Sequence, residues 1–226
     1  MQQLKKWIRT ALAIIFPQKP SAFDFVQVSP EEVLRTSPGA ARVEPPLFPS
    51  RCFAVLSYKY PRTRALIWQI KYKRDAAAIA TGGYILYRTL QHKFPNQKLI
   101  IVPIPVSPAR RRERGYNQCE LLATAILKNN PALLTVRTDI LFRSLHTKRQ
   151  TLKNRNERLA VTHGIFSINK KFLSDTPTQL RESDNLKCKH LVVIDDVLTT
   201  GSTLREAFTT LEKVGFTNVS GLTLAH

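Results

Sequence analysis

Cysteines are few in this sequence, and they lie far apart. Cys52, Cys119 and Cys188 form no C-x-x-C pair, which excludes a disulfide scaffold and a standard cysteine zinc module, so no zinc is expected. Such sparse cysteines are typical of the reducing cytosol, and a cytoplasmic localisation is predicted. Long apolar runs are absent too. Because a helix needs roughly 20 apolar residues to cross a bilayer, no membrane span is expected.

Several motifs of common enzyme classes are also missing. The sequence has no G-x-x-x-x-G-K-[ST] of P-loop nucleotide hydrolases, no G-x-G-x-x-G dinucleotide fingerprint and no G-x-S-x-G nucleophile elbow. Its five histidines show no spacing suited to metal ligation. The sequence therefore predicts no metal ion held directly by its own side chains.

Acidic residues are scarce, since 16 Asp and Glu stand against 35 Lys and Arg and the formal net charge is +19. Almost all of the excess, +16, falls within residues 59–158, whereas residues 1–58 carry +3 and residues 159–226 are neutral. Such a chain attracts polyanions, namely nucleic acid, nucleotides, phosphorylated substrates or an anionic membrane surface. The excess could be an ordinary solvated surface, but the clustering of one sign favours an anion-binding face.

The first 50 residues differ in composition from the rest of the chain. Residues 4–16 indicate a short basic amphipathic helix, which either packs on the domain or lies at a membrane surface. Residues 17–50 hold seven of the 14 prolines, and because proline lacks an N–H and fixes φ, they predict an extended arm. A short helix is expected within this arm over Pro30–Arg35, with Ser29 as its N-cap.

Residues 51–226 alternate between strand and helix patterns and form the predicted main domain. With 43% hydrophobic residues the chain can bury a sizeable core. Its apolar stretches are too continuous for a half-exposed sheet, which indicates an α/β fold with a parallel sheet flanked by helices. The expected strands are 52–58, 99–103, 140–143, 163–168, 191–194 and 219–224. The expected helices are 62–73, 76–90, 117–128, 151–159 and 202–214, the last with Gly215 as its C-cap.

The segment LVVIDDVLTTGST (191–203) carries the clearest chemistry. Its apolar strand delivers Asp195 and Asp196 to the carboxyl edge of the sheet, where open α/β folds bind ligands. The next turn opens a helix whose first N–H groups and positive dipole end suit a phosphate. Two carboxylates repel a bare phosphate but accept hydrogen bonds from vicinal hydroxyls or interact with a Mg²⁺ shell. The segment therefore predicts a ribose 5-phosphate ligand, against the alternative of an ordinary capped strand–helix junction. The predicted 5-phosphate loop consists of Thr199, Thr200, Gly201, Ser202 and Thr203.

This segment resembles the phosphoribosyl pyrophosphate motif of type I phosphoribosyltransferases, and three further blocks narrow the resemblance to the ComF/GntX-type branch. The blocks are IWQIKYKRD (67–75), VPIPVSPARRRERGYNQCELLA (102–123) and RSLHTKRQTLKNRNERLAVTHGIF (143–166). The resemblance implies a type I phosphoribosyltransferase-like parallel sheet with a small hood, here joined to the extended N-terminal arm. Relatives commonly begin with a four-cysteine zinc module, which this chain lacks, so zinc binding is not carried over.

The resemblance also implies roles for residues in the other blocks. The turn around Ser107 would hold pyrophosphate through backbone amides, although its prolines equally suit a rigid connector. Arginine matches polyphosphate because its planar fork binds oxygens bidentately, and the arginine run lies near a mobile hood with Gly115 as its hinge, unless it is only a solvated loop. The residues assigned to pyrophosphate and the hood are Lys71, Ser107, Arg110, Arg111, Arg112, Arg114 and Gly115.

Two functions are compatible with these assignments. In the first, the chain is an enzyme: phosphoribosyl pyrophosphate brings Mg²⁺ to Asp195 and Asp196, the predicted catalytic residues, and an unidentified nitrogen acceptor takes the phosphoribosyl group. In the second, the pocket binds a sugar phosphate or single-stranded DNA without turnover, as an accessory of the DNA-uptake machinery that the resemblance implies. The residues assigned to a second substrate or to nucleic acid are Arg143, Lys148, Arg149, Gln150, Lys153, Arg155 and Arg158.

Overall fold

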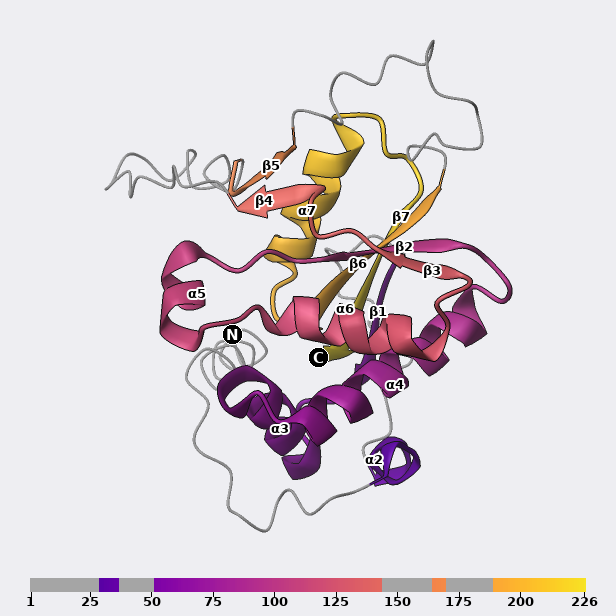
Figure 1. Ribbon diagram of the computed structural model, residues 1–226, viewed down its shortest axis with the longest axis vertical. Coiled ribbons are helices and arrows are strands. Elements are labelled where there is room, and N and C mark those ends of the chain that lie inside the picture. The colour runs from indigo at the N-terminus through magenta and orange to yellow at the C-terminus, as the bar shows by residue number, and fades with distance from the viewer. Residues whose placement is uncertain (1–28, 37–50, 144–163, 170–188) are drawn as a thin grey trace, which may run out of the picture.

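The computed structural model describes residues 29–36, 51–143, 164–169 and 189–226. Their centre is a five-stranded sheet with the order β1-β7-β6-β2-β3, in which all neighbouring strands run parallel (Figure 1). Its strands are β1 (Cys52–Leu56), β2 (Leu99–Pro103), β3 (Leu134–Val136), β6 (His190–Val197) and β7 (Val219–Ala225). The predicted α/β class with a parallel sheet is confirmed.

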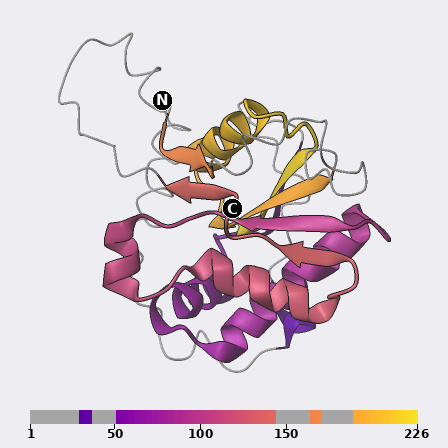
Figure 2. The same cartoon turned by 45° about the horizontal axis from the view of Figure 1, so that its top comes forward.

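Helices cover both faces of this sheet, as Figures 1 and 2 show. They are α3 (Pro61–Trp68), α4 (Ala76–Lys93) and α6 (Gln118–Asn129) on one face and α7 (Ser202–Glu212) on the other. Successive side chains of a strand point to opposite faces, so Val192 and Ile194 of β6 pack with α3, α4 and α6. Leu191 and Val193 of the same strand pack with α7. Because all four side chains are buried, β6 lies at the centre of the core.

A second, antiparallel sheet packs beside α7. It pairs β4 (Leu141–Arg143) with β5 (Phe166–Ile168), and Leu141 lies opposite Ile168. Leu141 and Phe166 are buried in the same cluster as Leu204 of α7. In both views of the fold this strand pair lies toward the same end of the molecule as α5 (Pro108–Arg114).

Helices α4 and α6 cross at close range. A Cβ atom at Gly83 would lie 2.3 Å from the Cβ of Ala125, so the two backbones approach to a distance that only glycine allows. Helix α6 also packs against β2 and β6. Its first turn is therefore held at the carboxyl edge of the sheet, next to the end of β6.

Part of the proline-rich arm is docked on the domain. Helix α2 (Pro30–Thr36) begins at the predicted N-cap, where Ser29 Oγ accepts a hydrogen bond from the N–H of Glu32 at 3.2 Å. Val33 is only 2% exposed and belongs to the core cluster of α4, and Glu32 pairs with Arg62 at 2.6 Å. The predicted short helix is confirmed, whereas the division of the chain at residue 50 stays a prediction.

Several elements differ from the sequence-based expectation. Strand β3 and helix α5 were not expected from the sequence. The helix expected over 62–73 is α-helical only as far as Trp68 and continues as a π-helical turn, η2 (Gln69–Lys73). Helix α7 ends at Glu212, so Gly215, with φ of 94°, lies beyond its C-cap rather than at it. The helices expected over 4–16 and 151–159 lie outside the described residues. Among the described helices, none is both long and apolar enough to cross a membrane.

Candidate functional site

The acidic pair lies where the parallel strands end. Asp195 and Asp196 are the sixth and seventh residues of β6, between β2 and β7 in the sheet. The chain leaving β2 stays close to this strand, because the N–H of Ile104 donates to the carbonyl of Ile194 at 2.9 Å. The segments that follow β2 and β6 therefore meet at one edge, as expected for ligand binding in an open parallel sheet.

Asp195 is half-buried and held through one of its oxygens. Its Oδ1 accepts hydrogen bonds from the N–H of Asp196 at 2.9 Å and from the Cys119 thiol at 3.5 Å. Burial and then the charge of Asp196 raise the pKa of Asp195 from 3.8 to about 7, against the lowering effect of those donors and of Lys71. Burial also raises the pKa of Cys119 well above its ordinary value, so this thiol stays protonated and donates.

Asp196 is buried more deeply, with 4% of its surface exposed. Its Oδ1 pairs with the ammonium of Lys71 at 3.2 Å, whereas its buried Oδ2 has no hydrogen-bond partner. Lys71 is itself only 8% exposed. The structure thus places this lysine, which was assigned to pyrophosphate, directly on the acidic pair. An unpartnered carboxylate oxygen at such a depth is costly.

The predicted phosphate loop has the geometry of a helix start. Gly201 caps α7 with φ of 72° and ψ of 5°, a left-handed conformation that favours glycine. Thr200 Oγ1 lies 3.1 Å from Ser202 Oγ, and the N–H of Ser202 donates to Thr200 Oγ1 at 3.4 Å. Thr200 and Ser202 are exposed, and Thr199 and Thr203 are half-buried. The loop therefore presents hydroxyls and the first N–H groups of α7 beside the acidic pair.

The arginine run forms helix α5 rather than a loop. Ser107 is its N-cap and accepts the N–H of Arg110 at 3.2 Å, Pro108 occupies the first turn, and Gly115 closes it with φ of 79°. No atom lies within 4 Å of a Cβ placed at Gly115, so the backbone conformation alone requires glycine there. The hinge role of Gly115 and the pyrophosphate role of Ser107 stay predictions.

The four arginines of this helix differ in their surroundings. Arg110 and Arg112 are exposed. Arg111 forms an ion pair with Glu120 at 3.0 Å. Arg114 stacks over the ring of Tyr72 at 4.9 Å and donates to Gln118 at 3.4 Å. Arg111 is exposed as well, but its guanidinium is paired, so Arg110 and Arg112 are the better placed of the described arginines of α5 to meet an incoming anion.

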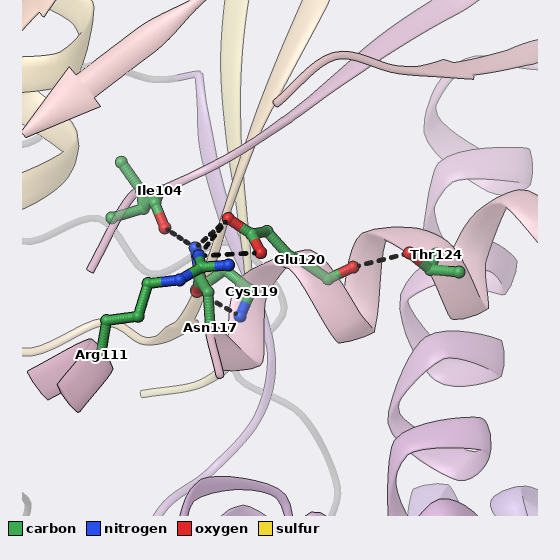
Figure 3. Close-up of polar contacts among 6 residues, drawn as sticks. All are labelled: Ile104, Arg111, Asn117, Cys119, Glu120 and Thr124. Atoms are coloured by element: carbon green, nitrogen blue, oxygen red, sulfur yellow. Dashed lines mark hydrogen bonds and ion pairs between the residues drawn. The ribbon is translucent and has the colours of Figure 1, made fainter. Parts of the chain in front are cut away.

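Asn117 joins the segment after β2 to the start of α6, as Figure 3 shows. Its Nδ2 donates to the carbonyl of Ile104 at 3.0 Å and to Glu120 Oε1 at 3.2 Å, and its Oδ1 accepts the N–H of Cys119 at 2.9 Å. Glu120 in turn binds Arg111. The sequence analysis does not place Asn117 or Cys119 at the site, although an asparagine directly before an apolar helical pattern is a recognised N-cap signal.

Arg143 of β4, which was assigned to a second substrate or nucleic acid, interacts electrostatically with two residues of the candidate site. Burial and then the charge of Arg110 lower the pKa of Arg143, and the charge of Asp195 opposes this effect. Its guanidinium also lies 5.6 Å from the ring centre of Phe166. The other residues assigned to a second substrate or nucleic acid lie outside the described residues: Lys148, Arg149, Gln150, Lys153, Arg155 and Arg158.

No group of three or more His, Cys, Asp or Glu side chains within the described ranges could hold a metal ion. The two carboxylates alone offer too few ligands for a closed protein site. They are, however, suited to a Mg²⁺ ion that arrives with a phosphorylated ligand and keeps most of its water. The described free cysteines, Cys52 and Cys119, are both buried.

Comparisons with known proteins agree with this geometry. A family model described as a phosphoribosyl transferase domain matches residues 126–225. Competence protein ComFC of Bacillus subtilis is 31% identical over 157 residues, which cover 69% of this chain and 56% of that protein. Competence protein F of Haemophilus influenzae is 29% identical over 159 residues, which cover 66% of this chain and 62% of that protein. The chain thus spans about three fifths of the length of these curated relatives.

Among solved structures, the allosteric regulatory enzyme of purine biosynthesis aligns with a TM-score of 0.39 and 13% sequence identity, over 70% of this chain and 30% of that one. The family assignment is supported instead by the domain match, by the similarity to the two competence proteins and by the acidic pair followed by a glycine-capped helix. The domain match and the two competence proteins support a ComF-type, phosphoribosyltransferase-like family for this chain.

Proposed function

We propose that this protein binds phosphoribosyl pyrophosphate with Mg²⁺ at the carboxyl edge of its sheet and transfers the phosphoribosyl group to a nitrogen acceptor. The observation that carries this proposal is the acidic pair at the end of β6, which lies beside the glycine-capped start of α7. A ligand that satisfies both features needs a hydroxyl donor and, next to it, a phosphate. A ribose 5-phosphate combines the two.

The two ends of the site would divide the ligand between them. The ribose hydroxyls would donate to the carboxylates of Asp195 and Asp196, and the 5-phosphate would accept from the loop 199–203 and the first N–H groups of α7. Arg110 and Arg112, which are exposed on α5, would contact the pyrophosphate. Arg143 would add its charge from the side of β4, where Asp195 and Arg110 influence its pKa.

In the proposed reaction, the acceptor nitrogen forms a bond to C1 of the ribose while the bond from C1 to the pyrophosphate oxygen breaks. Both electrons of the broken bond leave with pyrophosphate, and the proton of the acceptor nitrogen passes to solvent or to a base. The positive charge that develops on the ribose is favoured by the nearby carboxylates. Mg²⁺ carried by the substrate supplies charge neutralisation on the departing pyrophosphate. The arginines would add to that neutralisation.

A second function is binding without turnover, in support of DNA uptake. Two relatives are named competence proteins, and the chain carries an excess charge of +16 within residues 59–158. The exposed Arg110 and Arg112 belong to that excess. In this case the pocket would hold a sugar phosphate or an end of single-stranded DNA, and the basic region would bind the phosphate backbone.

Calorimetry with phosphoribosyl pyrophosphate and Mg²⁺ tests the pocket. The wild type should bind, and the double variant Asp195→Asn/Asp196→Asn should lose binding while remaining folded. Each lost hydrogen bond to a charged group is worth about 1.5–3 kcal/mol. Glu212→Gln is the matched control, because it removes the charge of an exposed carboxylate at the far end of α7. Unchanged affinity in the double variant would refute the pocket.

A second measurement separates the two functions. Pyrophosphate release is followed over a panel of nitrogen bases, and binding to single-stranded DNA is followed as salt is raised. Release with one of the bases supports the transferase. Binding of phosphoribosyl pyrophosphate without release, together with DNA affinity that falls by about 0.7 log units per phosphate contact for each tenfold rise in salt, supports the accessory.

A further inference from the structure

Tyr116 ties the two ends of the turn that carries Lys71. The tyrosine is buried, and its hydroxyl donates to the carbonyl of Ile70 at 2.9 Å and accepts the N–H of Arg74 at 3.1 Å. Ile70 directly precedes Lys71, and Arg74 directly follows η2. A single hydroxyl group from the segment after α5 therefore bridges the residues on either side of the site lysine.

The turn has reasons to need such a bridge. π-Helical turns are rare, and they occur mainly at functional sites. At the end of any helix the last carbonyls lack partners within the helix, and the carbonyl of Ile70 finds its partner in Tyr116. Arg74 adopts φ of 50° and ψ of 35°, a left-handed conformation that is unfavourable for a side chain with a Cβ. The Tyr116 hydroxyl satisfies the carbonyl of Ile70 and adds a second acceptor for the N–H of Arg74, which also donates to the carbonyl of Gln69.

Two stacking contacts reinforce the bridge from opposite directions. The guanidinium of Arg74 lies 5.8 Å from the centre of the Tyr116 ring, and that of Arg114 lies 4.9 Å from the centre of the Tyr72 ring. One cation thus comes from the end of η2 and the other from α5. Cation–π contacts of this kind are directional as well as attractive, so the segment 114–116 and η2 hold each other in one arrangement.

We propose that Tyr116 is a positioning residue of the sugar-phosphate site, because its hydroxyl holds the π-helical turn that keeps the Lys71 ammonium on Oδ1 of Asp196. This ion pair holds the Asp196 carboxylate in one orientation at the end of β6, beside Asp195. The effect on ligand binding rests on the proposed function. The effect on Lys71 does not, since its burial and its ion pair belong to the protein alone.

Lysine acetylation measures the position of Lys71 without any ligand. Acetic anhydride is applied to the folded protein, and the extent of modification at each lysine is read by mass spectrometry. In the wild type, Lys71, at 8% exposure, should be protected relative to the exposed Lys73 two residues later. In Tyr116→Phe, which keeps the ring and removes the hydroxyl, the acetylation of Lys71 should rise about tenfold as the turn opens.

Two further variants make this measurement specific. Tyr84→Phe is the matched control, because it also removes a tyrosine hydroxyl, one that accepts from the exposed Arg88 at 3.0 Å, and it should leave Lys71 protected. Arg74→Gly in the Tyr116→Phe background should restore protection in part, since glycine adopts positive φ without strain. If Tyr116→Phe alone does not fold, the acetylation of Lys71 is measured in this double variant instead. Protection of Lys71 in folded Tyr116→Phe equal to that in the wild type would overturn the proposal.

Titration with phosphoribosyl pyrophosphate and Mg²⁺ tests the consequence for the site. Tyr116→Phe and Lys71→Gln should each weaken binding roughly five- to tenfold, the effect of about one hydrogen bond. The double variant should bind no more weakly than Lys71→Gln alone, because the tyrosine acts through the lysine. Additive losses would contradict the proposal. If the wild type does not bind this ligand, the proposed function fails, and acetylation of Lys71 still decides the role of Tyr116.

Discussion

Replacement of Asp195 by asparagine should stabilise the protein at neutral and alkaline pH while it removes ligand binding. The asparagine keeps an oxygen that can accept from the N–H of Asp196 and from the Cys119 thiol, the two donors on Oδ1. It also removes a negative charge that is buried beside a second one. Burial and the charge of Asp196 raise the pKa of Asp195 from 3.8 to about 7, so the ionised form is unfavourable in the folded state.

The raised pKa sets the sign and the size of the effect. Between pH 4 and about pH 7 the folded wild type retains a proton that the unfolded chain has released, so its free energy of unfolding falls as the pH rises. The pKa of Asp195 rises from 3.8 to about 7 on folding. At about 1.4 kcal/mol per pKa unit, ionisation of Asp195 lowers the free energy of unfolding by at most about 4 kcal/mol. Since the side chain is half-buried and partly screened, we expect a gain of about 2–4 kcal/mol in Asp195→Asn at pH 8.

Urea unfolding of the wild type and of Asp195→Asn, measured from pH 4.5 to pH 8.5, tests this prediction. The difference in unfolding free energy should be small at the acidic end, grow with pH and level off above about pH 7. Glu212→Gln should show no comparable rise, because its carboxylate is exposed at 42%. A difference that is flat over this range, or a variant that is less stable than the wild type at pH 8, would refute the electrostatic reasoning.

Three other substitutions test separate parts of the structure. Val33→Ala should lower the free energy of unfolding by about 1–3 kcal/mol in a urea titration, because Val33 is buried in the core cluster of α4; no loss would show that α2 is not docked in solution. Gly115→Ala should cost about 1 kcal/mol through its φ of 79° alone, since no atom would touch the new methyl group. Arg143→Ala should weaken binding of phosphoribosyl pyrophosphate about tenfold, the effect of one hydrogen bond to a charged group, and weaken binding of single-stranded DNA less. If paired titrations show a larger loss of affinity for single-stranded DNA than for phosphoribosyl pyrophosphate, Arg143 belongs to the nucleic-acid surface instead.

The central strands could be predicted from the sequence because both of their faces are buried. Strand β2 has the predicted bounds, Leu99–Pro103, and all five residues are buried. An unbroken apolar run of this length leaves few alternatives. Helix α5 could not be predicted in the same way, because its arginine-rich sequence has no apolar period. Its signals are a serine cap and a proline in the first turn, and these equally suit a turn.

The acidic pair and the phosphate loop could be placed from sequence, because they lie on one contiguous strand–turn–helix segment. The partners of the pair could not. Lys71 reaches Asp196, and Cys119 reaches Asp195, only through the packing of η2 and α6 onto the sheet. Neither residue type at those positions signals such a contact. The sequence therefore predicts the location of the carboxylates, but it does not predict that Lys71 pairs with one of them.

The pairing of β1 with β7 has a consequence for synthesis on the ribosome. Cys52 of β1 pairs with Gly221 of β7, so about 170 residues must be translated between the two halves of this contact, which at 5–20 residues per second takes roughly 10–30 s. Until Val219–Ala225 has left the exit tunnel, β6 has no neighbour on one side and β1 has none within the sheet. The edge of the sheet that carries the acidic pair is therefore complete only after β7 has been made, and until then β1 is open to misassembly or chaperone capture.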